Sequence, residues 1–144
     1  ARINTSINYT HITGDGRYLS PREWGKDPFY TFMPRERNDG LGKVHAVVIK
    51  SSVTFFKERF KTAIAYGFFS LPDVKDYRLN KYGMPSYHQV NLDLSYAFTK
   101  AFKGLECKFN AALKRDAGET YDNLKYIYNK VNMVNMSLTL DFNI

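Results

Sequence analysis

Hydrophobic and polar residues alternate with a period of two along six segments of the chain. The strictest segment is 89–98, where Val90, Leu92 and Leu94 fall on one side and Asn91 and Asp93 on the other. Segments 134–144, 105–114 and 2–10 follow the same rule, whereas 44–55 and 60–68 follow it less strictly. This period predicts six β-strands, each with one apolar and one polar face.

The connections between these strands alternate in length. Residues 13–43, 72–88 and 115–130 form long connections, and residues 56–59 and 99–104 form short ones. In an antiparallel up-and-down meander, every second connection lies at the same end, so the long loops share one end and the short turns share the other. Transmembrane β-barrels of the outer-membrane type have this asymmetry, and strands of ~9–11 residues suffice to cross the bilayer.

Composition is consistent with such a barrel. The 144 residues are enough for one domain, 16% of them are aromatic, and the formal net charge is +7. The mean hydropathy is nevertheless −0.44, as expected of strands that are apolar on one face only. The sequence contains no apolar run of the ~20 residues that a transmembrane helix needs, so we expect any membrane crossing to be made by strands.

Aromatic residues mark the predicted strand ends. They form one group near the short turns (Phe55, Phe60, Phe98) and one near the long loops (Tyr9, Phe68, Tyr87). Alternation alone fits a soluble β-sandwich as well, but two aromatic bands separated by aliphatic residues favour a membrane barrel. Because known single-chain barrels have at least 8 strands, we expect residues 1–144 to form the C-terminal part of a larger barrel whose N-terminal strands are absent here, or one of several chains that share a barrel.

The polar strand face would then line the lumen of the barrel. The charged candidates for lining this pore are Arg2, Lys50, Asp93, Glu106, Lys108, Lys114 and Asp141. Charges of both signs in a water-filled interior set ion preference. Lys108 and Lys114 lie on one face of one predicted strand, and we expect the pair to pass an anion from one to the next. A solvated strand face with incidental charge is the alternative.

The sequence shows no pattern that indicates catalysis, a cofactor or a metal. His11, His45 and His88 lie at the mouths of three different strands without the spacing of a metal motif. Cys107 falls on the apolar face, where a reactive thiolate is disfavoured. The long loops mix acidic and basic residues, whereas a phosphate-binding surface concentrates Lys and Arg, so no nucleic-acid partner is predicted.

The first long loop is the most unusual segment, because connections of this length in compact domains tend to be functional. Its aromatic residues Trp24, Phe29, Tyr30 and Phe32 are expected to pack together as an apolar knot. Its charged residues are expected to pair and leave a guanidinium free. The loop would fold into the barrel mouth, either as a structural brace or as a contact for the solute. The constriction candidates are Arg22, Glu23, Trp24, Arg35, Glu36 and Arg37.

Within this loop, Pro-Arg-Glu-Trp-Gly at 21–25, followed by an aromatic–Thr–aromatic step and Arg-Glu-Arg within 29–37, resembles a late extracellular loop of OprD-type outer-membrane porins. The resemblance implies an 18-stranded monomeric barrel in the outer membrane of a Gram-negative bacterium, with this chain as its last six strands. It also implies passive, substrate-selective uptake of small polar solutes such as carboxylates or amino acids. Outer-membrane lipid and lipopolysaccharide would surround the barrel, and association with other outer-membrane proteins stays open.

Two other functions remain in competition with the porin. One is a non-conducting outer-membrane barrel that acts as a receptor or an anchor. The other is a soluble β-sandwich that acts as a binding module. Heat-modifiable migration in detergent gels separates either barrel from the sandwich, and conductance separates the porin from the closed barrel.

Overall fold

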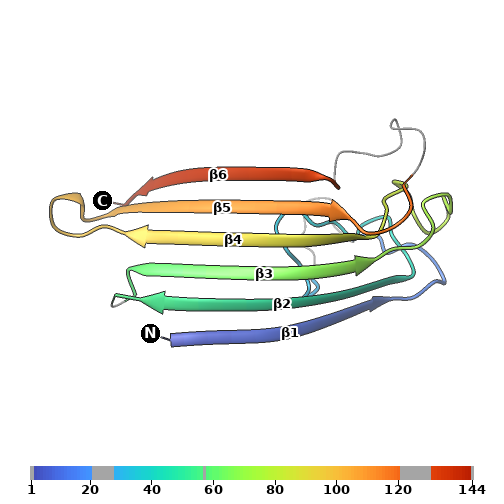
Figure 1. The fold of residues 1–144 in the computed structure, drawn as a ribbon, viewed down its shortest axis with the longest axis horizontal. Coiled ribbons are helices and arrows are strands. Elements are labelled where there is room, and N and C mark those ends of the chain that lie inside the picture. Colours follow the sequence, from blue (N-terminus) through green and yellow to red (C-terminus); the bar gives the residue numbers. More distant parts are fainter. Residues whose placement is uncertain (1, 21–27, 57, 121–130, 144) are drawn as a thin grey trace.

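The computed structural model describes residues 2–20, 28–56, 58–120 and 131–143. They form one six-stranded antiparallel sheet in which every strand pairs with the next one in the chain (Figure 1). The strands are β1 (Arg2–Ile12), β2 (Val44–Phe55), β3 (Phe60–Ser70), β4 (Tyr87–Ala97), β5 (Leu105–Asp116) and β6 (Met133–Phe142), and a short 3₁₀ turn, η1, covers Lys100–Phe102. The predicted all-β, up-and-down architecture is therefore confirmed, as an open sheet. The described residues include no helix long and apolar enough to cross a membrane.

The strand ends differ slightly from the predicted ones. β4 begins at Tyr87, two residues before the predicted start, and β5 continues to Asp116, beyond the predicted end. Residues 121–130, most of the third predicted long loop, lie outside the described residues.

The short connection before β5 ends at Gly104, whose φ of +95° and close approach to the carbonyl oxygen of Asn143 leave no room for a side chain.

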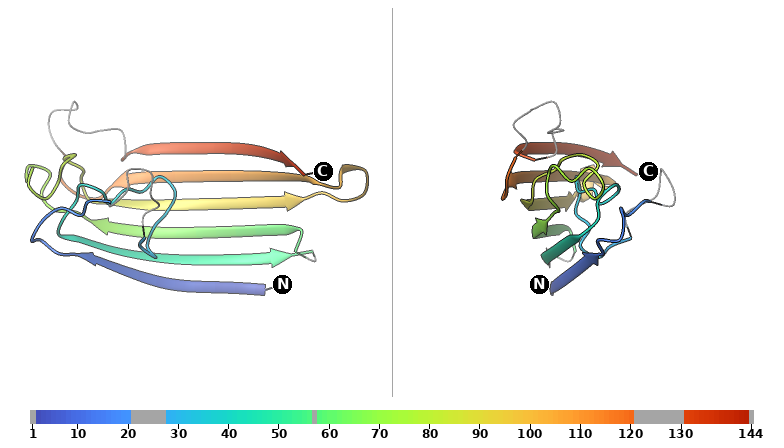
Figure 2. Two further views of the ribbon diagram at one scale, coloured as in Figure 1. Left: turned by 180° about the vertical axis from the view of Figure 1, so that it is seen from behind. Right: turned by 90° about the vertical axis from the view of Figure 1, so that its right-hand side faces the viewer.

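The two faces of the sheet differ sharply. Residues that lie directly opposite each other on neighbouring strands project from the same face of the sheet. The register therefore gives one apolar face and one mainly polar face. We call the face that carries Ile7, Ile49, Tyr66, Val90, Leu113 and Val134 the outer face. The face that carries Ser6, Lys50, Ala65, Asn91, Ala112 and Asn135 is the inner face. The sheet curves, and the loops lie on its concave side (Figure 2, right).

Large apolar side chains on the outer face are exposed. Ile7 is 74% exposed and Leu138 66%, and Ile3, Met136 and Leu140 are exposed to a similar degree. These residues do not meet one another in a core. The predicted sidedness of the strands is thus present in the structure, with the apolar face uncovered.

A small core lies instead between the inner face and the loops, at the end of the sheet where the long loops are. It contains Met33, Ala46, Val48, Phe69, Met84, Tyr87 and Val131. Its position explains why segment 44–55 alternates weakly: near the loops, both faces of β2 are apolar.

Tyr87 corrects one prediction. It was expected in the outer aromatic band near the long loops, but it is 1% exposed and stacks on Phe69 with ring centroids 4.7 Å apart. Tyr87 has the parity of Gln89 and Asn91, so its side chain points to the inner face. The other band residues fit better: Tyr9 and Phe68 are on the outer face near the long loops, and Phe55 lies opposite Phe60 at the short turn.

Candidate functional site

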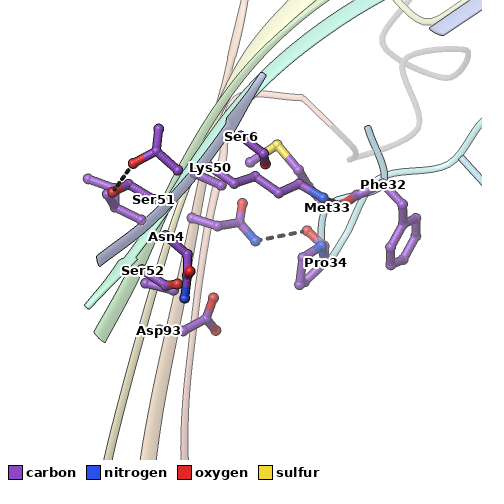
Figure 3. A pocket seen from close by; sticks show the side chains of 14 residues that line it. Asn4, Ser6, Phe32, Met33, Pro34, Lys50, Ser51, Ser52 and Asp93 are labelled. Atoms are coloured by element: carbon purple, nitrogen blue, oxygen red, sulfur yellow. Dashed lines mark hydrogen bonds between the residues drawn. The ribbon is translucent and has the colours of Figure 1, made fainter. Parts of the chain in front are cut away.

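Residues 28–41 of the first long loop lie across the inner face of the sheet, close to the wall formed by β1 to β6. The segment presents backbone carbonyl groups to polar side chains of the strands. On β2, the Lys50 ammonium donates to the carbonyl oxygens of Tyr30 and Phe32, both at 2.8 Å. Figure 3 shows Lys50 reaching from the wall toward Phe32 and Met33.

Two side-chain amides on β4 bind another carbonyl group of the loop, that of Pro34. The side-chain nitrogen of Gln89 donates to the carbonyl oxygen of Pro34 at 2.6 Å, and that of Asn91 donates to the same oxygen at 3.3 Å. Gln89 also donates to the side-chain oxygen of Asn91 at 2.7 Å, which orients the pair. Both side chains are buried beneath the loop. The two amides therefore act as one anchoring unit.

Arg35 is held from two further strands. Lys114 on β5 donates its ammonium to the carbonyl oxygen of Arg35, and Arg35 donates Nε to the side-chain oxygen of Asn135 on β6 at 3.1 Å. Arg35 has a φ of 71°, in the left-handed region that non-glycine residues rarely adopt. Such a conformation persists when surrounding contacts fix it, and here the contacts on both sides do so.

The remaining two strands also contact the loop. On β1, the hydroxyl groups of Thr10 and Thr31 form a buried hydrogen bond of 2.8 Å. On β3, Gly67 lies so close to the loop that an added Cβ would be 2.8 Å from the sulfur of Met33. Every strand of the sheet thus touches the segment. We call this set of contacts the clamp.

The local sequence explains how the loop presents its carbonyl groups. The peptide N–H of Glu36 bonds to the carbonyl of Met33 at 2.9 Å and closes a turn around Pro34. The Glu36 carboxylate accepts the Met33 N–H and the Asn38 amide, both at 2.7 Å. The carbonyl groups of Pro34 and Arg35, within and after this turn, accept hydrogen bonds from the wall.

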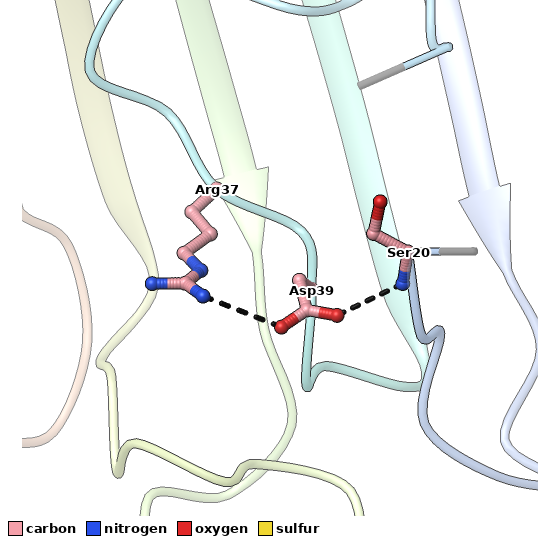
Figure 4. Close-up of polar contacts among 3 residues, drawn as sticks. All are labelled: Ser20, Arg37 and Asp39. Atoms are coloured by element: carbon pink, nitrogen blue, oxygen red, sulfur yellow. Dashed lines mark hydrogen bonds and ion pairs between the residues drawn. The ribbon is translucent and has the colours of Figure 1, made fainter. Parts of the chain in front are cut away.

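The two arms of the loop are tied to each other. The carboxylate of Asp39 accepts the peptide N–H of Ser20 at 2.9 Å with one oxygen and the Arg37 guanidinium at 3.4 Å with the other (Figure 4). The second long loop supports the first through Asn80, which is buried and pairs with Leu41 in an isolated bridge.

A pocket of about 380 Å³ lies between the clamped loop and the wall. Its polar lining includes Asn4, Ser6, Lys50 and Asp93, and Phe32 and Pro34 of the loop close it on one side (Figure 3). Lys50 uses two of its three N–H groups on loop carbonyls, and Asp93 accepts a bond from Asn110 with one oxygen. Within the described ranges, the third N–H of Lys50 and the other oxygen of Asp93 have no partner. The pocket therefore offers a cationic donor and an anionic acceptor to a small polar molecule.

All seven predicted pore-lining residues lie on the inner face, but they have different environments. Arg2 is exposed at the end of the sheet where the short turns are, and Lys50 and Asp93 line the pocket. Lys108 pairs with Glu106 at 3.2 Å and with Asp141 at 2.6 Å. Lys114 is 1% exposed beneath the loop, with its ammonium 4.6 Å from the centre of the Tyr87 ring. The expected relay of anions from Lys108 to Lys114 is therefore wrong, because Lys114 is buried and bonded.

The constriction candidates are only partly described. Arg22, Glu23 and Trp24 lie outside the described residues. Arg35 and Glu36 belong to the clamp and its turn, and Arg37 forms its ion pair with Asp39. The predicted aromatic knot does not include Tyr30, which is 85% exposed, and Phe29 packs on Tyr18 at 5.0 Å. Trp24 lies outside the described residues, so the described loop is held by its wall contacts together with the Phe29–Tyr18 contact.

Sequence reasoning missed the uncharged strand residues of the clamp, namely Thr10, Gly67, Gln89, Asn91 and Asn135. The available signal was their position on the polar side of the alternating strands, next to apolar core residues.

The three histidines all lie on the outer face. The described residues contain no group of three or more His, Cys, Asp or Glu side chains that could hold a metal ion.

In comparisons with known proteins, no family model, no curated protein and no solved structure matches the chain.

Proposed function

We propose that this sheet is part of the wall of a transmembrane β-barrel, with its outer face against lipid and its inner face lining a conduit for small polar solutes. The observation that carries the proposal is the division of one sheet into an exposed apolar face and a polar face crossed by a clamped loop. Both halves of this arrangement are required of a porin. The apolar face suits the bilayer, and the polar face suits a water-filled lumen.

The outer face supports placement in a membrane. Soluble proteins rarely expose contiguous apolar patches larger than a few hundred Å². Here exposed Ile, Leu, Val or Met side chains lie on β1, β2, β3, β5 and β6, and β4 between them adds the exposed Tyr96 and half-buried Val and Leu side chains. A β-sandwich would cover this face with a second sheet, whereas the loops of this chain lie on the opposite face (Figure 2).

The unpaired edges of β1 and β6 support continuation of the sheet. In the described part of the chain, neither edge has a further strand partner, and lipid-exposed sheet edges do not occur within the hydrocarbon region. Additional strands would therefore pair with both edges in the assembled protein. The loop motif that resembles OprD-type porins favours an 18-stranded barrel of the outer membrane, surrounded by lipid and lipopolysaccharide.

The clamp would narrow the conduit. It fixes residues 30–35 over the inner face, and Lys50 of β2 and Asp93 of β4 both line the pocket beside it. A solute with both a carboxylate and an amino group would find a partner for each charge, and a simple carboxylate would find one. We therefore propose passive, selective diffusion of small polar solutes such as carboxylates or amino acids.

Conductance of the full-length protein in a planar lipid bilayer tests this function. The proposal expects discrete ion-conducting steps that the candidate solutes reduce in a concentration-dependent way. Heat-modifiable migration in detergent gels should accompany them. A protein that migrates normally and stays in solution without detergent would instead support the soluble binding module.

A closed barrel is the second candidate, and the number of clamp contacts favours it. A loop fixed to every strand of the sheet can seal a barrel as well as narrow one. A heat-modifiable protein that inserts into bilayers and never conducts would identify a receptor or an anchor.

A further inference from the structure

The outer face of the six strands carries very few basic groups, and all of them lie at the long-loop end. No Asp, Glu or Lys occupies an outer position of any of these strands, and the only His and Arg residues there are His11, His45, His88 and Arg115. We propose that these four residues, the basic row, bind the phosphate groups of membrane lipids at the rim of the apolar face. This inference rests on the proposed membrane placement and adds a lipid site to it.

The strand register brings the four side chains into one band. His11 lies directly opposite His45, and the two rings stack with centroids 4.4 Å apart. His88 lies directly opposite Arg115 on the neighbouring strand. Between these pairs, β3 contributes Ser70 opposite His45 and Phe68 opposite His88, so the band is continuous across β1 to β5. His11, His45 and Arg115 are exposed, and His88 is partly exposed.

Two tyrosines orient the histidine rings. The Tyr9 hydroxyl bonds to Nδ1 of His45 at 2.8 Å, and the Tyr66 hydroxyl bonds to Nδ1 of His88 at 2.7 Å. Among the residues that the structure describes, Nε2 of both histidines has no protein partner. An imidazole held through one ring nitrogen keeps the other available for a ligand. Each of these pairs therefore presents an oriented nitrogen at the surface.

The position of this band indicates what kind of ligand it would bind. It lies directly beyond the exposed apolar side chains of the outer face, and its tyrosines are of the type found at the level of lipid head groups. Basic groups without acidic neighbours on the same face complement an anion, and the apolar surface beside them complements acyl chains. A lipid with a phosphate monoester head group supplies both.

Lipid binding by the full-length protein tests the inference. We would reconstitute it in nanodiscs of phosphatidylcholine with and without phosphatidic acid, and measure the lipid retained in native mass spectrometry. Phosphatidic acid should be retained in preference to phosphatidylcholine. Arg115→Gln should weaken its binding about fivefold, since one basic residue near an anionic surface contributes roughly that factor. The combination of His11→Gln, His45→Gln, His88→Gln and Arg115→Gln should abolish the preference.

The matched control is Arg59→Gln with Lys103→Gln, which removes basic charge from the short connections at the opposite end of the sheet. This control should keep the preference for phosphatidic acid. Equal retention of both lipids by the wild type, or an unchanged preference in the fourfold variant, would overturn the lipid site while leaving the conduit intact. A protein that enters neither kind of bilayer would refute the membrane placement, and the lipid site with it.

Discussion

The ammonium of Lys114 donates to the backbone carbonyl oxygen of Arg35, a residue 79 positions earlier in the chain. Lys114 projects from β5 onto the inner face and is buried there, next to the ring of Tyr87. A buried lysine that donates to a main-chain carbonyl fixes the position of the backbone and does not recognise a particular side chain. The position of the loop is thus linked directly to the wall of the sheet.

Lys114→Met should release this part of the loop. A hydrogen bond from a charged donor contributes about 1.5–3 kcal/mol, and here it also holds Arg35 in a left-handed conformation. We expect a lower thermal unfolding midpoint in detergent micelles and larger single-channel conductance. Lys108→Met is the control, because it makes the same change on the same strand and face at an exposed ion pair. Equal effects of the two substitutions on conductance would contradict the role of the clamp.

Gly67→Ala should prevent the loop from docking on β3. An added Cβ would lie 2.6 Å from a ring carbon of Phe69 and 2.8 Å from the sulfur of Met33, so the core must shift. Overpacking of this kind costs about 1–3 kcal/mol. Protease sensitivity of the loop in detergent should rise along with the loss of stability. Gly16→Ala is the control, since nothing lies within 4 Å of its added Cβ. Equal protease sensitivity of both variants would show that Met33 does not dock on Gly67.

Leu94→Arg and Asp93→Arg test the assignment of faces with neighbouring residues. Leu94 lies on the outer face, where an unpaired guanidinium at the bilayer midplane costs ~2–4 kcal/mol, so insertion and heat-modifiable migration should fail. Asp93 lies on the inner face beside the pocket, so Asp93→Arg should preserve insertion and shift the ion preference toward anions. Identical behaviour of the two variants in both assays would show that the faces are assigned wrongly.

The sequence predicted the strands and their faces because one rule governs both. A period of two fixes the strand and also the side of the sheet on which each residue lies. Tyr87 departs from the predicted outer aromatic band because it has the parity of Gln89, which places its side chain on the inner face. The order of the strands followed from the alternation of long and short connections, which indicated an up-and-down meander.

The clamp could not be predicted, because it depends on main-chain carbonyl groups. Every residue has a carbonyl, so the acceptors of Lys50, Gln89 and Lys114 leave no mark in the sequence of the loop. The donors looked like ordinary residues of a polar strand face. Lys108 and Lys114 are chemically identical and lie on the same strand. Lys114 is buried because the loop covers it, whereas Lys108 lies beyond the loop and is exposed. Contacts between residues so distant in the chain have no local signal.

We expect Arg35 to contribute more to ion selectivity than the other charged residues of the inner face. Apart from Lys50, whose ammonium bonds to the loop, the half of the inner face near the short turns carries three basic side chains (Arg2, Lys61, Lys108) and three acidic ones (Asp93, Glu106, Asp141). Arg35 donates only Nε to Asn135, and within residues 2–20, 28–56, 58–120 and 131–143 its other N–H groups have no partner. Its guanidinium therefore remains available to an anion in the conduit.

Arg35→Gln should lower the ratio of anion to cation permeability, measured as a shift of the reversal potential in a salt gradient across a planar bilayer. The shift should shrink as the ionic strength rises, because salt screens a charge at the surface of a conduit. Lys108→Gln should shift the reversal potential less, since Glu106 and Asp141 already neutralise that ammonium at 3.2 and 2.6 Å. A larger shift from Lys108→Gln than from Arg35→Gln would place the selective region on the open wall of the sheet rather than at the clamp.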